Sequence, residues 1–257
     1  MSIRDEFNFE SHEFTSYLKE DIAVIKIRAS VFDTLTDLVE SGKMLSLIQL
    51  AERIPDIKVL LILNEPGCMG DEEYDMFLKR ILERGIDPYA PEEARGIVQK
   101  IDRAREINIL NRTISHLVDF KKISVMGLQG SIVTPFFGAS LAVDFRFVSG
   151  DMFYSMAHLK YGIHPGGALP FFLQHYLSHS KTMEILLKSE KLSAVEAKEL
   201  GLITKILPAG NFEEQCLKEL EDICYLDTRV IHATKLLANF SRTELRHYFD
   251  IESALLH

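Results

Sequence analysis

Residues 191–208 read KLSAVEAKELGLITKILP, and the local structure of this stretch is well specified. Ser193 and Glu196 have the spacing of a capping box, in which each side chain bonds a backbone amide at the start of a helix. Gly201 is placed to end that helix, because glycine tolerates the left-handed backbone that closes many helices. The apolar residues at 203–207 then predict a short strand. Taken alone, the stretch predicts one helix followed by one strand.

Buried strands alternate with helical segments along the rest of the chain. Runs of β-branched and apolar residues predict strands at 22–28, 57–63, 123–127 and 145–148. Apolar residues at helical spacing predict helices at 35–54, 71–84, 92–120 and after Pro135, with mainly helical structure from Pro165 onward. This alternation predicts an α/β fold with a helical C-terminal third.

Composition narrows the classes of function that fit the chain. The 257 residues carry a net charge of −9, which argues against a nucleic-acid partner because no basic surface neutralises phosphates. No apolar run approaches the roughly 20 residues that span a bilayer, so no membrane partner is expected. Three cysteines are too few for a disulfide framework or a zinc site, and no metal is expected. We therefore expect a cytoplasmic protein with reduced thiols.

The stretch at 191–208 resembles a block of the crotonase (enoyl-CoA hydratase/isomerase) family, R-I-S-A-E-E-A-x-x-x-G-L-V-x-x-V-V-P. Three further stretches resemble other blocks of that family in the same order: FKKISVMGLQG at 120–130, SLAVDFR at 140–146 and YGIHPGG at 161–167. The resemblance covers roughly residues 20–250. It implies a right-handed spiral of ββα turns with C-terminal helices. The core of the spiral is then expected at 1–190, and a helical part that takes part in oligomerisation at 191–257.

The resemblance also implies a chemistry and an assembly. Members of the family bind acyl-CoA thioesters and stabilise an enolate oxyanion with two backbone amides. We therefore expect a small-molecule acyl-CoA substrate, no separate cofactor, and a homotrimer or homohexamer. The residues expected to bind the CoA part of the substrate are Arg28, Gly70 and Thr134.

Two helix starts are the candidates for the oxyanion site. In the family the first amide follows a motif ending G-A-D, and here that position is Asp71, after Met69-Gly70. The second amide comes from a glycine triplet that falls here on Thr134-Pro135-Phe136, so the donor position holds a proline without an N–H. With Thr134 as N-cap and Pro135 as first helical residue, the amides of Phe136 and Phe137 would be free at the helix tip. The alternative is that both are ordinary helix starts that bind no ligand. In that case the carboxylate of Asp71 only complements the dipole of its own helix.

The two glutamates that a hydratase of this family uses are both absent. The first position is Gly138, which cannot carry a proton, and the second is His158. Histidine titrates near neutrality and is a capable base, so His158 is the candidate catalytic residue. The alternative is a buried structural histidine. His164, in the turn before Pro165, is a weaker candidate.

Two interpretations of function stay open. In the first, the chain is an enzyme on acyl thioesters, a hydrolase, lyase or isomerase that uses His158 but not an ordinary hydratase. In the second, it is a catalytically lapsed member of the family that serves as a binding or assembly subunit. A dehydratase or decarboxylase acting on carrier-protein substrates is a third possibility, with no residue in its support.

Overall fold

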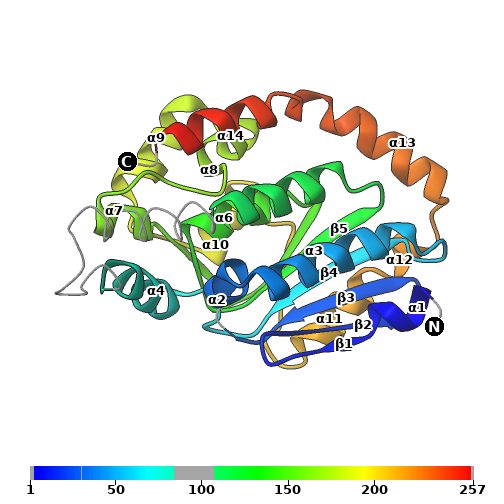
Figure 1. The fold of residues 1–257 in the computed structure, drawn as a ribbon. Coiled ribbons are helices and arrows are strands. Elements are labelled where there is room, and N and C mark those ends of the chain that lie inside the picture. The colour runs from blue at the N-terminus through cyan, green and yellow to red at the C-terminus, as the bar shows by residue number, and fades with distance from the viewer. Residues whose placement is uncertain (1–2, 30, 84–106, 256–257) are drawn as a thin grey trace.

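The computed structural model describes residues 3–29, 31–83 and 107–255, and its centre is a seven-stranded sheet (Figure 1). The strand order is β1-β2-β3-β4-β5-β7-β10. β2 is antiparallel to both of its neighbours, whereas the pairs from β3 to β10 are parallel. The strands are β1 (Phe9–Glu10), β2 (Phe14–Lys19), β3 (Ile22–Ile27), β4 (Val59–Asn64), β5 (Ile123–Leu128), β7 (Phe145–Ser149) and β10 (Lys205–Leu207).

A second sheet of three short strands lies next to the helix that carries the candidate site. Its order is β6-β8-β9, with β6 parallel and β9 antiparallel to β8. The strands are β6 (Ser131–Val133), β8 (Phe153–Ser155) and β9 (Lys191–Ser193). The sequence did not predict them, because three residues carry too little periodicity to be recognised.

Helices cover both faces of the large sheet (Figure 1). In the described ranges they are α1 (Ile3–Phe7), α2 (Val31–Thr36), α3 (Leu38–Arg53), α4 (Asp71–Glu83), an unlabelled helix at 107–119, α6 (Thr134–Leu141), α7 (Ala157–Tyr161), α8 (Leu169–Tyr176), α9 (His179–Lys188), α10 (Ala194–Glu199), α11 (Phe212–Glu219), α12 (Glu221–Cys224), α13 (Thr228–Ala238), the 3-10 helix η1 (Asn239–Arg242) and α14 (Leu245–Ala254).

Alternate residues of the central strands face two separate apolar cores. Ile25 and Ile62 pack into a large core with α3, α6 and the helix at 107–119. Val24 and Leu61 pack into a smaller core with α11 on the opposite face. Because both faces are covered, these strands read as continuous apolar runs in the sequence.

The predicted central strands and the predicted capping box are present in the described residues. The four predicted parallel strands are present to within two residues at each end. Both hydrogen bonds of the capping box between Ser193 and Glu196 are formed, and Gly201 has φ +74°. The predicted helix at 92–120 is present at 107–119, and residues 92–106 lie outside the described residues.

The division of the chain at residue 190 stays a prediction. β9 and β10 follow that boundary but pair with β8 and β7, so they complete the two sheets. The purely helical part starts at α11 (Figure 1), and α13 contacts the large sheet through Lys235, which donates to the Lys122 carbonyl and to the Asp144 carboxylate. None of the helices in the described ranges has the length and apolar character that crossing a bilayer requires.

Candidate active site

The starts of α4 and α6 lie side by side at the carboxyl ends of the parallel strands. After β4 the chain turns through Gly67, whose φ is +96°, and the amide of Gly70 donates to the Gly67 carbonyl at 2.8 Å. Val133, the residue before α6, donates its amide to the carbonyl of Met69 at 3.0 Å. In open α/β sheets the crevice outside these strand ends is the usual place for a ligand. The structure thus brings together the two helix starts that the sequence singled out.

The first turn of α4 leaves backbone amides without a helical acceptor. The first amide to bond within the helix is that of Tyr74, which donates to the Gly70 carbonyl at 3.1 Å. The amides of residues 71–73 precede it and have no carbonyl to reach inside the helix. The side chain of Asp71 turns toward the small sheet, where it accepts from the hydroxyls of Ser131 at 2.7 Å and Ser155 at 2.5 Å. These bonds fix the start of α4 beside β6 and β8.

The start of α6 differs from the predicted geometry by one residue. The N-cap is Val133, so Thr134 is the first helical residue and Pro135 the second. The prediction of Thr134 as N-cap is wrong because its hydroxyl bonds His158 instead of a backbone amide of its own helix. Phe136 is then the third helical residue, whose amide has no helical acceptor, whereas the amide of Phe137 reaches the carbonyl of Val133 in a regular helix.

Gly138 lies where no side chain has room. A Cβ placed on it would be 2.1 Å from the carbonyl oxygen of Gly167 and 2.9 Å from the amide nitrogen of Leu169. In turn, a Cβ on Gly167, whose φ is +69°, would be 2.1 Å from the carbonyl oxygen of Pro135. The backbone of the loop at 165–168 therefore packs directly on the backbone of α6. This contact occupies the space into which a glutamate at position 138 would extend.

His158 is buried on α7, and both of its ring nitrogens have protein partners. Nε2 is 2.9 Å from the carbonyl oxygen of Leu186, which only accepts, so Nε2 carries the hydrogen. Nδ1 is then bare in the neutral ring and accepts from the hydroxyl of Thr134 at 2.9 Å. Burial lowers the pKa of His158, because the charged ring loses its hydration. The ring is held neutral between α6 and α9.

The lowered pKa of His158 predicts a loss of stability in mild acid. The unfolded chain binds a proton at the ring near pH 6.5 and the folded chain only at lower pH, so stability falls as pH drops below about 6.5. Urea unfolding at pH 7.5 and 5.5 measures this fall, which should be smaller in the variant His158→Asn. An equal fall in both proteins would show that another group is responsible.

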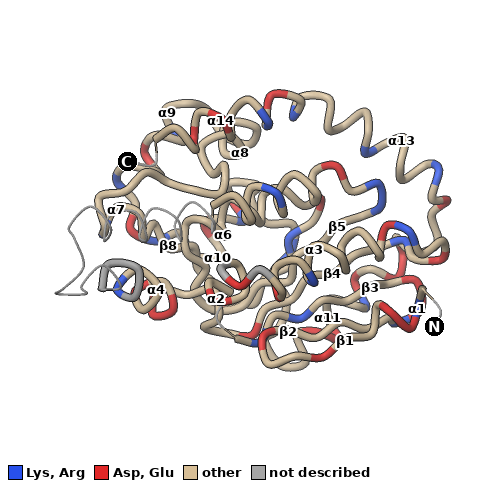
Figure 2. Tube along the Cα trace, viewed as in Figure 1, with Lys and Arg blue, Asp and Glu red and all other residues tan. Residues whose placement is uncertain are grey.

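A pocket of about 520 Å³ opens beside the start of α4 and brings three predicted residues together. Arg28, Gly70 and Asp71 all line it. Its other described lining residues are Ala29, Pro66, Gly67, Cys68, Glu72, Glu73, Ser131 and Phe153. Three carboxylates of the first turn of α4 line this pocket, and Figure 2 shows acidic residues at the start of that helix. The guanidinium of Arg28 already bonds Glu10 at 3.0 Å. Thr134, Phe136 and His158 lie in the interior instead.

Aromatic side chains fill the space between α2, α4 and α6. The ring of Phe32 lies 5.0 Å from both Tyr74 and Phe77 and 5.1 Å from Phe136. An apolar cavity of about 40 Å³ adjoins Phe136 and Met69. Because aromatic residues are common in cores, only the fold reveals that these four rings meet at the two helix starts.

Asp75 and the weaker candidate His164 both have partners outside the pocket. Asp75 on α4 accepts from Lys160 at 2.6 Å and from the hydroxyl of Tyr161, which links α4 to α7. The Nδ1 atom of His164 lies 3.4 Å from the carbonyl of Pro165, within its own turn. Among the described residues, no group of three His, Cys, Asp or Glu side chains is placed to hold a metal ion.

Comparison with known proteins assigns the chain to a family. The family model described as enoyl-CoA hydratase/isomerase matches residues 93–257, which include α6, His158 and all of the C-terminal helices. The chain belongs to the enoyl-CoA hydratase/isomerase family. The predicted membership is thus confirmed, and with it the crotonase type of α/β fold.

The relatives share the fold at low sequence identity. A probable enoyl-CoA hydratase of Mycobacterium tuberculosis is 25% identical over 150 residues, which are 55% of this chain and 50% of that protein. The chain thus spans about half the length of the curated relatives it matches. An enoyl-CoA hydratase structure from Mycobacterium avium subsp. paratuberculosis has a TM-score of 0.73 at 21% identity and covers 96% of this chain and 93% of that one. One from Bacillus halodurans has a TM-score of 0.75 at 18% identity, with 95% and 93% covered.

Proposed function

We propose that this member of the enoyl-CoA hydratase/isomerase family binds an acyl thioester at the adjoining starts of α4 and α6 and is not an ordinary enoyl-CoA hydratase. The observation that carries the proposal is the backbone contact between Gly138 and Gly167, which leaves no room for an acid or base at position 138. Hydration of a double bond requires a paired base and acid around one water. One member of that pair is missing and has no space in which to be restored.

Binding of the thioester rests on the amides of the two helix starts. The amides of Asp71 and Phe136 both lack helical acceptors, and the bond between Val133 and Met69 fixes the two starts relative to each other. Amides at helix starts stabilise negative charge such as that developing on an enolate oxygen. The pocket of Arg28, Gly70 and Asp71 receives the carrier part of the thioester. The cavity of about 40 Å³ next to Phe136 favours a short acyl group.

His158 remains the proposed proton carrier for a hydrolase, lyase or isomerase reaction. To act on a substrate, its ring would have to give up its bond to either Thr134 or Leu186, because each nitrogen has a partner. The proposal therefore requires a rotated ring in the substrate complex. If His158 carries the proton, the variant His158→Ala loses turnover and keeps its thioester affinity.

The deciding experiment is the melting temperature of the pure protein with CoA, acetyl-CoA and crotonyl-CoA. A ligand that binds only the folded state stabilises it by about 2.7 kcal/mol at 100 times its Kd. We expect a rise that grows with the concentration of the thioesters, and no measurable hydration of crotonyl-CoA. An unchanged melting temperature with all three would contradict thioester binding, and rapid hydration would contradict the loss of the acid–base pair.

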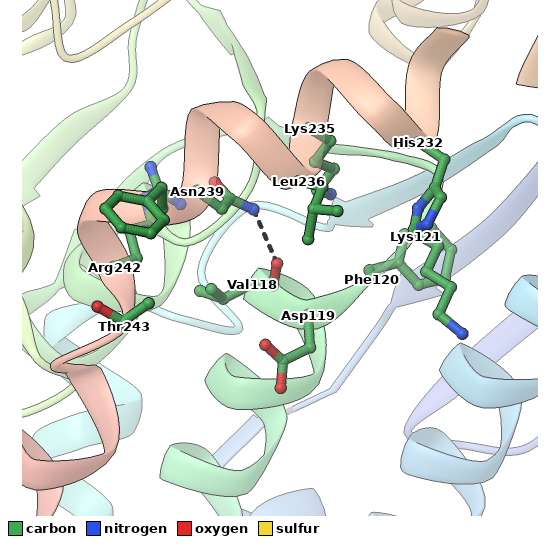
Figure 3. A pocket seen from close by; sticks show the side chains of 11 residues that line it. Val118, Asp119, Phe120, Lys121, His232, Lys235, Leu236, Asn239, Arg242 and Thr243 are labelled. Atoms are coloured by element: carbon green, nitrogen blue, oxygen red, sulfur yellow. Dashed lines mark hydrogen bonds between the residues drawn. The ribbon is translucent and has the colours of Figure 1, made fainter. Parts of the chain in front are cut away.

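An assembly subunit is the second candidate, supported by the unusual exposure of α13. This helix buries Ile231 and Lys235 but leaves Leu236 and Leu237 exposed by 66% and 77%. A pocket of about 240 Å³ adjoins Lys235 and Leu236. There the side-chain amide of Asn239 donates to the Val118 carbonyl at 2.9 Å (Figure 3). A helix of 11 residues with apolar side chains on its outer face is marginal in water. A solution mass of three or six chains without any thioester-induced rise in melting temperature would favour this candidate.

A further inference from the structure

Glu252 is a buried carboxylate that neither candidate function uses. It lies on α14, and only 3% of its surface is exposed. Its Oε1 atom accepts a hydrogen bond from the backbone amide of Ala168 at 3.1 Å, across 84 residues of chain. Burying a carboxylate is costly unless hydrogen bonds compensate it. This contact therefore needs a physical explanation.

The start of α8 explains why a carboxylate is stabilised here. Ala168 is the N-cap of α8 and has no side chain with which to cap the helix; its φ is +53°. Pro170 in the first turn contributes no N–H. A negative charge near the start of a helix is favourable, and an oxygen acceptor at its first amides replaces a capping side chain. Glu252 thus caps α8 from another helix.

The same loop lies against the start of α6. Gly167, which precedes Ala168, is the residue whose backbone packs on Pro135 and Gly138. The hydrogen bond of Glu252 is therefore one residue away from the contact that fills position 138. A displacement of Ala168 would move Gly167 with it, because the two are joined by one peptide bond.

α14 is docked on α8 by one face. Its buried residues are Leu245, Phe249 and Glu252, which recur at the spacing of a single helical face. The ring of Tyr248 lies 5.5 Å from that of Phe171 on α8. The carboxylate therefore comes from a helix whose buried face belongs to the same apolar core as α8.

We propose that Glu252 is a positioning residue: through Ala168 it holds the loop at 165–168 against α6 and keeps the space beside Gly138 closed. Docking of α14 then controls how far the start of α6 is open. The consequence for ligands rests on the proposed function: release of Glu252 gives a thioester wider access to the amide of Phe136.

Hydrogen exchange of backbone amides tests the proposal without any ligand. In Glu252→Ala we expect the amides from Ala168 to Phe172 to exchange about tenfold faster, while α3 keeps its protection. Glu252→Gln should restore protection to within about threefold, because its amide oxygen still accepts from Ala168. Asp250→Ala is the matched control, since it removes an exposed carboxylate from the same helix. Acetyl-CoA should raise the melting temperature of Glu252→Ala more than that of the unaltered protein.

The outcomes separate the positioning role from the proposed function. Equal exchange at Ala168 in Glu252→Ala and the unaltered protein would overturn the positioning role, as would a failure of Glu252→Gln to restore protection. If Glu252→Ala does not fold, Glu252→Gln and the shorter Glu252→Asp are compared instead. Slow exchange at the Ala168 amide in Glu252→Gln and fast exchange in Glu252→Asp would support the positioning role. Equal exchange in these two variants would refute it. Absence of any acetyl-CoA effect in every variant refutes thioester binding only.

Discussion

Replacing Gly138 with alanine is expected to lower the free energy of unfolding by about 3 kcal/mol, a fall of roughly 6–12 °C in melting temperature. The added Cβ would lie 2.1 Å from the carbonyl oxygen of Gly167 and 2.9 Å from the amide nitrogen of Leu169. Both neighbours are backbone atoms, so no flexible side chain can move aside. The loop at 165–168 has to shift as a whole, or α6 has to move. Urea unfolding and thermal melts of the pure variant measure the loss.

Gly42→Ala is the matched control, because it makes the same change inside another helix. Gly42 lies in α3, and no atom stands within 4 Å of a Cβ added there. That variant should be more stable by about 0.5–1 kcal/mol, since alanine restricts the unfolded chain. Opposite signs for the two substitutions would support the close backbone contact. If Gly138→Ala instead melted within a degree of the unaltered protein, position 138 would be open and the argument against a hydratase would fail.

The same contact supports the proposed absence of the acid–base pair, because one substitution at position 138 could not supply it. Glutamate at position 138 would need the volume that the backbone of Gly167 now fills. We infer that the loop at 165–168 and the residue at position 138 depend on each other. Gain of hydratase activity would require a different loop as well as a glutamate.

Local interactions are the part of this fold that the sequence predicts well. The capping box of Ser193 and Glu196 is complete within four residues, and Gly201 needs only its own backbone conformation. The central strands were recognisable because both faces are covered, which makes the runs apolar throughout. These signals do not depend on contacts with distant segments.

Contacts between distant segments explain what the sequence could not predict. The pattern Thr134-Pro135 favours an N-cap, yet the hydroxyl of Thr134 bonds His158 from another helix. That Gly138 stands at the family's first glutamate position stays a prediction, and the backbone of Gly167, which packs on Gly138, comes from a later loop. Gly70 and Asp71 line one pocket with Arg28, because all three follow the ends of neighbouring parallel strands; their part in binding CoA stays a prediction.

Lys235 is buried, although its position in the sequence favours exposure to solvent. It lies among leucines on α13, where a lysine would ordinarily face solvent. Instead its side chain is 5% exposed and its Nζ atom donates to the carboxylate of Asp144 at 2.7 Å. It also donates to the carbonyl of Lys122 at 2.9 Å and lies 3.2 Å from the hydroxyl of Ser124.

Replacing Lys235 with methionine is therefore expected to cost about 3–5 kcal/mol of stability. The substitution leaves the carboxylate of Asp144 largely buried, with its bonds to the amide and hydroxyl of Ser124 but without a cation. Asp144→Asn should cost a similar amount, because it leaves the ammonium group of Lys235 without its counter-charge. In the double variant the loss should be smaller than the sum of the two single losses, since neither charge is then present. Urea unfolding of the four proteins gives this comparison.

Lys205→Met is the matched control for the loss of a lysine. Its partner is Glu219 at 2.6 Å, and its own side chain is 51% exposed, so the loss should stay below about 1 kcal/mol. The contrast tests whether the bond between Lys235 and Asp144 is what holds α13 on the sheet. The buried side chains of α13 are those of Ile231 and Lys235. Because Lys235→Met removes the bond to Asp144, α13 should open more often and become accessible to proteases in this variant. If Lys235→Met were as stable as Lys205→Met and α13 stayed protected, α13 would be held by other contacts and the pair would have no structural importance.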